Sequence, residues 1–92
     1  MLDIEFTRKM KRDVKRMRKR GYDMSKLDAI LRLLSSQEPM PPGHLDHKLS
    51  GDLSGFRECH IESDWLLIYK ILENRLTLSA TGTGTDSDLF EK

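Results

Sequence analysis

Four residues that can transfer protons or bind phosphates and bases lie close together in the middle of the chain. They are Arg57, His60, Asp64 and Trp65, in the segment "GFRECHIESDW". An imidazole near a carboxylate can hold a defined tautomer or a raised pKa, which suits general acid–base catalysis. The same residues also suit an ordinary polar hairpin with a hydrogen-bonded histidine, so the segment alone leaves both interpretations open.

Arg57, Trp65 and Phe90 each have a functional and a structural interpretation. The guanidinium of Arg57 can bind a phosphate, but strict alternation along a strand puts Arg57 and His60 on opposite faces. Both can serve one site only if a bulge intervenes or the strand is short and twisted; otherwise Arg57 is structural. The rings of Trp65 and Phe90 can stack on nucleobases, or they can fill the core and fasten the C-terminal segment.

Residue spacing disfavours other kinds of site. His44 and His47 are three residues apart on a predicted strand and would point to opposite faces, so we expect no metal site with His60. Residues 81–85, "TGTGT", lack the lysine and the context of a phosphate-binding loop, and we expect no cofactor. Cys59 is the only cysteine, which excludes an internal disulfide and fits a reducing cytoplasm.

The composition is typical of a globular chain. The 92 residues are 37% hydrophobic and 34% charged. No apolar stretch reaches the roughly 18 residues that a membrane span needs, and no apolar leader is visible at the N-terminus. We therefore expect one domain over residues 1–92, in the cytoplasm and without a membrane partner.

The net charge of +1 conceals an uneven distribution. Residues 1–49 contain 12 basic and 7 acidic side chains, whereas residues 50–92 contain 4 basic and 8 acidic ones. Nine of the basic side chains lie in "RKMKRDVKRMRKR", residues 8–20. Such a segment favours a polyanionic or acidic partner, although a solvated helix face explains the charges equally well.

The hydrophobic pattern predicts a strand and then a helix at the start of the chain. Apolar and acidic residues alternate over residues 2–6, as in a short strand with one buried face. Thr7 can then cap a helix that Gly21 ends. The narrow apolar stripe of this basic helix consists of Met10, Val14 and Met17.

A second amphipathic helix follows and ends near Ser36. Ser25 and Asp28 resemble a capping box at its start. Its apolar residues recur at helical spacing and are Leu27, Ile30, Leu31 and Leu34. The two predicted helices form an αα-hairpin.

The period changes to two after the proline-rich residues 38–43. The predicted strands are 44–49, 56–61, 65–71 and 74–80, and residues 81–90 can still lie along the sheet. Strand 65–71 is apolar on both sides, so we expect it to be central. This order predicts an α+β fold, in which an N-terminal strand and an α-helical hairpin pack on a mainly antiparallel four- to five-stranded sheet with one free face.

Together these segments resemble the YafQ branch of the RelE/ParE toxin superfamily over nearly the whole chain. The most specific segments are "DHKLSG", "GFRECHIESDWLLIYK" and "TGT…SDLF". The resemblance implies a RelE-like toxin of a bacterial or archaeal type II toxin–antitoxin system. It implies a ribosome-dependent endoribonuclease that cuts mRNA in the A site. The implied partners are a cognate antitoxin and the ribosome with its mRNA and rRNA.

The resemblance implies that His60, Asp64 and His47 form a metal-independent acid–base cluster. A base would take the 2′-hydroxyl proton, and an acid would protonate the leaving 5′-oxygen. The family motif commonly reads "TGTHSDLF", whereas this chain reads "TGTGTDSDLF". Asp86 takes the histidine position when counted from the C-terminus, and Gly84 does when counted from the start of the motif. An aspartate needs a raised pKa to donate a proton at neutral pH.

The implied substrate contacts are positive charge from Arg57 or Lys48 and base contacts from Trp65 and Phe90. An arginine that often precedes the motif is replaced by Ala80. The basic first helix would meet ribosomal RNA.

Two other functions stay open. A ParE-like gyrase poison is disfavoured, because it needs no acid–base cluster. A non-catalytic or weakened RNA- or antitoxin-binding relative is favoured by the missing C-terminal histidine.

Overall fold

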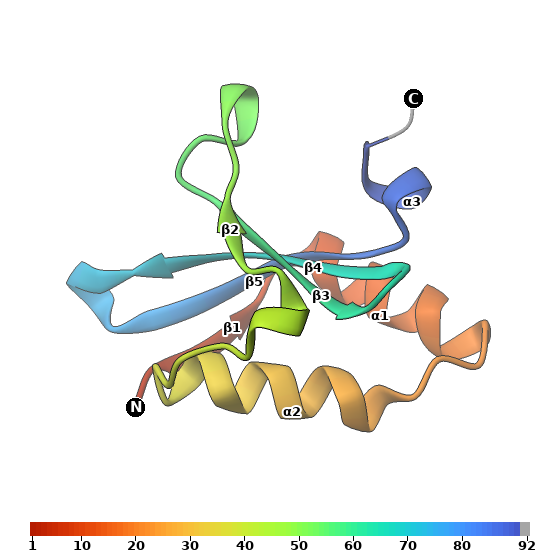
Figure 1. The fold of residues 1–92 in the computed structure, drawn as a ribbon, viewed down its shortest axis with the longest axis horizontal. Coiled ribbons are helices and arrows are strands. Elements are labelled where there is room, and N and C mark those ends of the chain that lie inside the picture. The colour runs from red at the N-terminus through yellow and green to blue at the C-terminus, as the bar shows by residue number, and fades with distance from the viewer. Residues whose placement is uncertain (91–92) are drawn as a thin grey trace.

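A five-stranded sheet with two helices on one face makes up the fold of residues 1–90, which the computed structural model describes (Figure 1). Residues 91–92 of the predicted domain lie outside the described part. The strands are β1 (Asp3–Phe6), β2 (His47–Lys48), β3 (Arg57–Glu62), β4 (Trp65–Leu72) and β5 (Thr77–Gly84). The helices are α1 (Arg8–Lys19), α2 (Met24–Ser35) and α3 (Asp86–Phe90), with 3-10 helices η1 (Pro42–His44), η2 (Gly51–Leu53) and η3 (Glu73–Arg75).

The strands follow the order β1-β5-β4-β3-β2 across the sheet. β1 runs parallel to β5, and the other neighbouring pairs are antiparallel. The predicted α+β fold with a mainly antiparallel sheet is therefore confirmed, and so is the central position of β4. The partner of the N-terminal strand, which the sequence left open, is the last strand.

Helix α1 begins and ends as predicted. The Thr7 hydroxyl oxygen accepts a hydrogen bond from the Met10 amide at 3.1 Å, and Gly21 follows the helix with a φ of 88°. Met10 and Met17 are fully buried, whereas Val14 only packs against the edge of the core. The third buried residue of the helix is Asp13, which an apolar stripe does not predict.

Helix α2 has a different cap from the predicted one. Asp23 is the N-cap, and its carboxylate accepts hydrogen bonds from the amide and the hydroxyl of Ser25 at 3.0 and 2.6 Å. The proposed Ser25–Asp28 box is wrong, because Ser25 already lies inside the helix and Asp28 instead pairs with Arg32 at 3.0 Å. The four predicted apolar residues are buried, and the C-cap is Ser36.

The strand predicted at residues 44–49 is reduced to the two residues of β2. The cause lies in the preceding backbone, because η1 ends at His44 and Leu45 has a left-handed φ of 49°. An extended strand cannot pass through either conformation.

The glycine- and threonine-rich C-terminal segment does more than lie along the sheet. Its first part extends β5 to Gly84, with a bulge at Thr81 that leaves this residue without a partner in β4. Its second part forms α3, which the sequence did not predict. A reciprocal cap starts this helix: the Thr85 amide donates to the Asp88 carboxylate at 2.9 Å, and the Asp88 amide donates to the Thr85 hydroxyl at 3.2 Å.

The core lies between the sheet and helices α1 and α2. It includes Trp65, Leu67 and Tyr69 of β4 and the apolar residues of α2. Ile4 of β1 is 41% exposed, so the prediction that the whole apolar side of this strand is buried is wrong. β1 is an edge strand, and the helices cover it incompletely. None of the helices within residues 1–90 is long and apolar enough to cross a bilayer.

The opposite face of the sheet is flanked by two projections. One is the β2–β3 connection, which contains η2, and the other is α3; both rise on the side away from α2 (Figure 1). We call this side of the sheet the open face.

Candidate active site

The sheet register brings two of the predicted acid–base residues, His47 and His60, to the open face together with Glu58. His47 lies opposite Glu58, and His60 follows two residues later on the same strand. Cys59 between them is buried in the core, so Glu58 and His60 point to the other side. Side chains two residues apart on a strand are about 7 Å apart. His47, Glu58 and His60 therefore form one group, which we call the His–Glu–His group.

His47 is held in a defined tautomer within this group. Its Nδ1 is 2.8 Å from the carbonyl oxygen of Leu45, and a carbonyl can only accept, so Nδ1 carries a proton. Its Nε2 lies 3.5 Å from the Glu58 carboxylate. The neutral ring can therefore accept a proton at Nε2, and the imidazolium that results would be stabilised by the negative charge of Glu58. Glu58, only 7% exposed, was missed by the sequence reasoning; its alternation with His60 was the signal that could have found it.

His60 is half-buried, and its own backbone carbonyl is bound by a second histidine. Nδ1 of His44 donates to the carbonyl oxygen of His60 at 2.7 Å. A hollow of about 430 Å³ lies beside them, between η1 and the β3–β4 turn. His44 thus has a structural contact. Within residues 1–90, no three His, Cys, Asp or Glu side chains are arranged so that they could hold a metal ion.

The two aspartates assigned to proton transfer lie at the margins of the site. Asp64 is exposed in the β3–β4 turn. Asp86 is exposed at the start of α3, two residues after Gly84. Gly84 and His60 lie in one row of the sheet, on either side of Leu66. Two strand spacings amount to about 10 Å, so Asp86 follows the end of that row.

Arg57 does not share the face of His60. It lies opposite Tyr69, a core residue, and its guanidinium donates to the Tyr69 hydroxyl at 3.3 Å and to Asp46 at 3.3 and 3.4 Å. The bulge of β3 comes after His60, not between the two residues. The face and the partners of Arg57 favour the structural alternative over the predicted phosphate-binding role. Lys48 pairs with Arg57 across the strands, so alternation turns it away from His47 as well.

Trp65 is a core residue. Its ring is fully buried, its Nε1 donates to the Thr83 hydroxyl oxygen at 2.8 Å, and it meets the Tyr22 ring edge-to-face at 5.1 Å. Neither ring face is open to a nucleobase, so the predicted stacking role is corrected. Phe90, in contrast, is 38% exposed at the end of α3 and is accessible.

A cavity of about 190 Å³ lies on the open face between the two projections. Leu53 and Phe56 line it from the η2 side, and Leu89 lines it from α3. Gly82 forms part of the floor; a Cβ there would approach Lys9 Nζ to 3.2 Å and Leu89 to 3.6 Å. This cavity was not visible in the sequence, because its lining comes from five separate parts of the fold.

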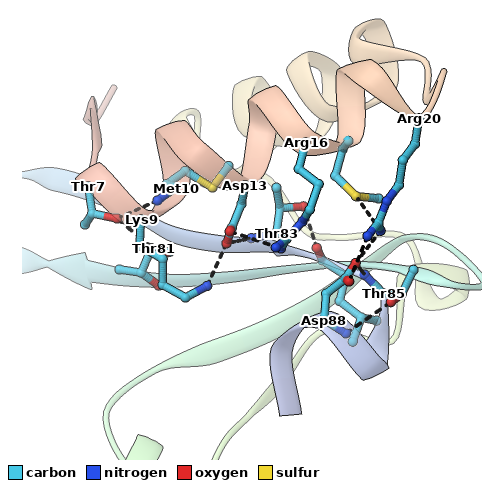
Figure 2. Close-up of polar contacts among 12 residues, drawn as sticks. Thr7, Lys9, Met10, Asp13, Arg16, Arg20, Thr81, Thr83, Thr85 and Asp88 are labelled. Atoms are coloured by element: carbon cyan, nitrogen blue, oxygen red, sulfur yellow. Dashed lines mark hydrogen bonds and ion pairs between the residues drawn. The ribbon is translucent and has the colours of Figure 1, made fainter. Parts of the chain in front are cut away.

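Asp13 fastens the basic helix α1 to β5 (Figure 2). Its carboxylate accepts hydrogen bonds from Lys9 at 2.6 Å, from Arg16 at 3.2 Å and from the Thr83 amide at 3.1 Å. β1 pairs with β5 only as far as Ala80, so Asp13 supplies the acceptor that a longer strand would have provided.

The exposed side of α1 carries a cluster of cations. They line a hollow of about 390 Å³ and are Arg12, Lys15, Arg16, Lys19 and Arg20. Residues four apart lie on one side of a helix, so the cluster is a continuous basic stripe. Arg16 and Arg20 are held by acidic partners, Asp13 and Asp88.

The family model for the bacterial toxin YafQ of type II toxin–antitoxin systems matches residues 2–91. The chain belongs to the YafQ toxin family. The mRNA interferase toxin YafQ of Escherichia coli K12 is 42% identical over 82 residues, which are 88% of this chain and 89% of that protein.

Solved structures of YafQ-like toxins share the whole fold. A metal-bound toxin from Helicobacter pylori superposes with a TM-score of 0.92 at 39% identity, covering 98% of this chain and 100% of that one. YafQ in the E. coli DinJ–YafQ toxin–antitoxin complex superposes with a TM-score of 0.86 at 40% identity, covering 97% of both chains. The RelE-like fold expected from the sequence is thus confirmed.

The YafQ-like C-terminal motif is placed by the structure in two elements. Gly84 lies within β5, paired with Leu66, whereas Asp86 begins α3. Thr81 forms the bulge of β5, and its hydroxyl donates to the carbonyl oxygen of Ile68 at 2.9 Å.

Proposed function

We propose that this chain is the toxin of a type II toxin–antitoxin pair and acts as an mRNA interferase, an endoribonuclease that cuts mRNA bound in the ribosomal A site. Its membership of the YafQ family and the mRNA interferase name of its E. coli relative support the reaction class. The observation that carries the proposal is the His–Glu–His group on the open face.

The proposed reaction is transfer of the phosphodiester to the neighbouring 2′-oxygen. His60 takes the 2′-hydroxyl proton, and the 2′-oxygen attacks phosphorus. The bond to the 5′-oxygen breaks, and this oxygen takes a proton from the imidazolium of His47, which the Glu58 carboxylate stabilises. The products carry a 2′,3′-cyclic phosphate and a 5′-hydroxyl. Asp64 and Asp86 border the site, with Asp86 as the alternative acid.

The substrate is proposed to enter along the open face. The cavity between η2 and α3 suits the apolar face of a base, and Phe90 offers an exposed aromatic ring at the end of α3. Lys9 brings a positive charge to the edge of the cavity, although it shares that charge with Asp13. Arg57, Lys48 and Trp65 have no role in substrate binding in this proposal.

The partners follow from charge and from the relatives. The basic stripe of α1 suits ribosomal RNA, so binding should weaken as salt rises. The E. coli relative is found in a complex with the antitoxin DinJ, and we propose a cognate antitoxin with an acidic segment for this chain. A toxin of translating ribosomes would act in the cytoplasm of a bacterium or archaeon.

The decisive experiment maps 5′ ends on an mRNA held in translating ribosomes. Wild-type protein should create new ends within A-site codons, and His60→Ala should lower the cleavage rate at least about 100-fold. Circular dichroism of both proteins checks that the substitution leaves the fold intact. A His60→Ala protein that cuts at the wild-type rate would contradict the assignment of His60.

A weakened relative is the second candidate, and Asp86 in place of a histidine favours it. In that case wild-type protein binds ribosomes but creates no new ends, and Asp86→His should restore them. A ParE-like gyrase poison would instead cause DNA damage and leave the mRNA intact.

A further inference from the structure

Helix α3 carries three residues of the proposed site but cannot hold its own position. Asp86, Leu89 and Phe90 belong to its five residues. Isolated helices shorter than about 12 residues are marginal in water. What places α3 relative to the open face must therefore be its contacts with the rest of the molecule.

The side chain of Asp88 makes the hydrogen bonds that join α3 to α1 and to the end of β5. The carboxylate of Asp88 accepts two hydrogen bonds from the Arg20 guanidinium, at 2.6 and 3.1 Å, across 68 positions in the sequence. The same carboxylate accepts the Thr85 amide at 2.9 Å. Asp88 thus caps α3 and binds the end of α1 at once, as Figure 2 shows.

Both ends of this contact are themselves held in place. Arg20 is the C-cap of α1, and its guanidinium also donates to the sulfur of Met17, a fully buried residue. On the other side, a Cβ at Gly84 would come within 2.9 Å of the Asp88 Cβ. Only a residue without a side chain lets Asp88 pack so closely against the end of β5.

We propose that Asp88, held by Arg20, is a positioning residue for the cleavage reaction: it fixes α3, and with it Asp86, Leu89 and Phe90, beside the His–Glu–His group. This inference rests on the proposed function and adds the device that sets the geometry of the site. The ion pair lies outside the cavity, so it acts on the reaction only through the helix.

The test uses Asp88→Asn, Arg20→Gln and the double variant, with Arg12→Gln as the matched control. Arg12 has the same charge and belongs to the same basic stripe as Arg20, but its ion-pair partners within residues 1–90 do not include Asp88. Cleavage of ribosome-bound mRNA is measured as a function of ribosome concentration, which separates the maximal rate from half-saturation. Amide hydrogen exchange of residues 85–90 is measured on the same free proteins.

Each single variant should lower the maximal rate about tenfold, because a misplacement of about 1 Å can cost that much or more. The double variant should lose no more than either single one. Arg12→Gln should change only half-saturation, as Arg20→Gln also does through its lost charge. Exchange at residues 85–90 should accelerate in the Asp88 and Arg20 variants alone.

Unchanged maximal rates in both single variants would overturn the proposal, as would additive losses in the double variant. If wild-type protein does not cut mRNA, the proposed function fails. Amide hydrogen exchange then tests the Arg20–Asp88 contact by itself. Unaltered protection of residues 85–90 in the Asp88 and Arg20 variants would show that this contact does not hold α3. If Asp88→Asn unfolds, Arg20→Lys keeps the cation but loses the two-point contact and should show the same selective loss.

Discussion

Two buried carboxylates in this protein have opposite surroundings. Asp13 is 4% exposed and Glu58 is 7% exposed. Asp13 accepts hydrogen bonds from Lys9, Arg16 and the Thr83 amide. Within residues 1–90, the ion-pair partner of Glu58 is a single histidine, His47, at 3.5 Å.

The difference separates a carboxylate that holds the fold together, Asp13, from one that is proposed to take part in the reaction, Glu58. The partners of Asp13 are two permanent cations and a backbone amide, so nothing in its surroundings changes charge near neutral pH. The partner of Glu58 is a histidine, the type of side chain whose ordinary pKa lies near neutral pH. Burial alone therefore does not mark a functional acid; what distinguishes Glu58 in the proposed reaction is its histidine partner.

The largest expected effect is on stability, from removal of the structural carboxylate. Asp13→Ala should lower the free energy of unfolding by about 2–3 kcal/mol, because it leaves the buried Thr83 amide without an acceptor and releases two cations. Urea denaturation followed by circular dichroism measures it. Asp13→Asn is the control, since its side-chain oxygen can still accept from Thr83 and should recover part of the loss. A loss below about 0.5 kcal/mol for Asp13→Ala would contradict the structural role of Asp13.

The next effect is on activity, from removal of the Glu58 charge. Glu58→Gln should lower the cleavage rate about tenfold, which corresponds to about 1.4 kcal/mol of transition-state stabilisation, because His47⁺ loses its counter-charge. The free energy of unfolding should change by less than about 0.5 kcal/mol.

Glu62→Gln is the matched control for that prediction. It removes the same charge from the same strand, but Glu62 pairs with Lys26 of α2 at 2.8 Å and lies away from His47. Its cleavage rate should equal that of the wild type. Equal losses in the two variants would show that the rate responds to net charge and not to the His47–Glu58 pair.

Several features that depend on neighbours along the chain could be predicted from the sequence. Alternation separated Arg57 from His60 correctly, and helix ends such as Thr7 and Gly21 were visible as single residues. The same alternation pairs Glu58 with His60, but an isolated glutamate gives no sign that it will be buried.

The remaining features depend on partners that are distant in the sequence. Asp13 acts on an amide 70 positions away, which is free only because β1 ends early. The ring of Trp65 is enclosed by Tyr22 and Thr83, so its core position could not be told from a base-binding one. Helix α3 was missed because five residues are too few for a helical period, although the Thr85–Asp88 cap was present in the sequence.

A smaller effect on stability is expected from Trp65, which lies on the core side of β4 and not on the open face. Trp65→Phe should lower the free energy of unfolding by about 1 kcal/mol, because it removes the hydrogen bond to Thr83 and part of the packed ring. Its cleavage rate should stay within about twofold of the wild type. Thermal denaturation and the ribosome cleavage assay measure the two quantities. A stable Trp65→Phe protein that no longer cuts mRNA would show that Trp65 does contribute to substrate binding.

The smallest effect concerns Asp88, a carboxylate near the surface that resembles Asp13 in having a permanent cation as its partner. The hydrogen bonds from Arg20 hold the pKa of Asp88 well below its ordinary value, and those from Thr85 act in the same direction. Because the pKa is lowered in the folded state, the stabilisation is complete above the ordinary pKa of about 3.9 and is lost as pH falls through the folded value. The contact between α1 and α3 should therefore be intact at neutral pH. In Arg20→Gln the Asp88 carboxyl carbon should titrate at a higher pH than in the wild type, as followed by NMR. The same titration midpoint in both proteins would mean that Thr85 alone sets it, and the contact with α1 would then contribute nothing to the charge of Asp88.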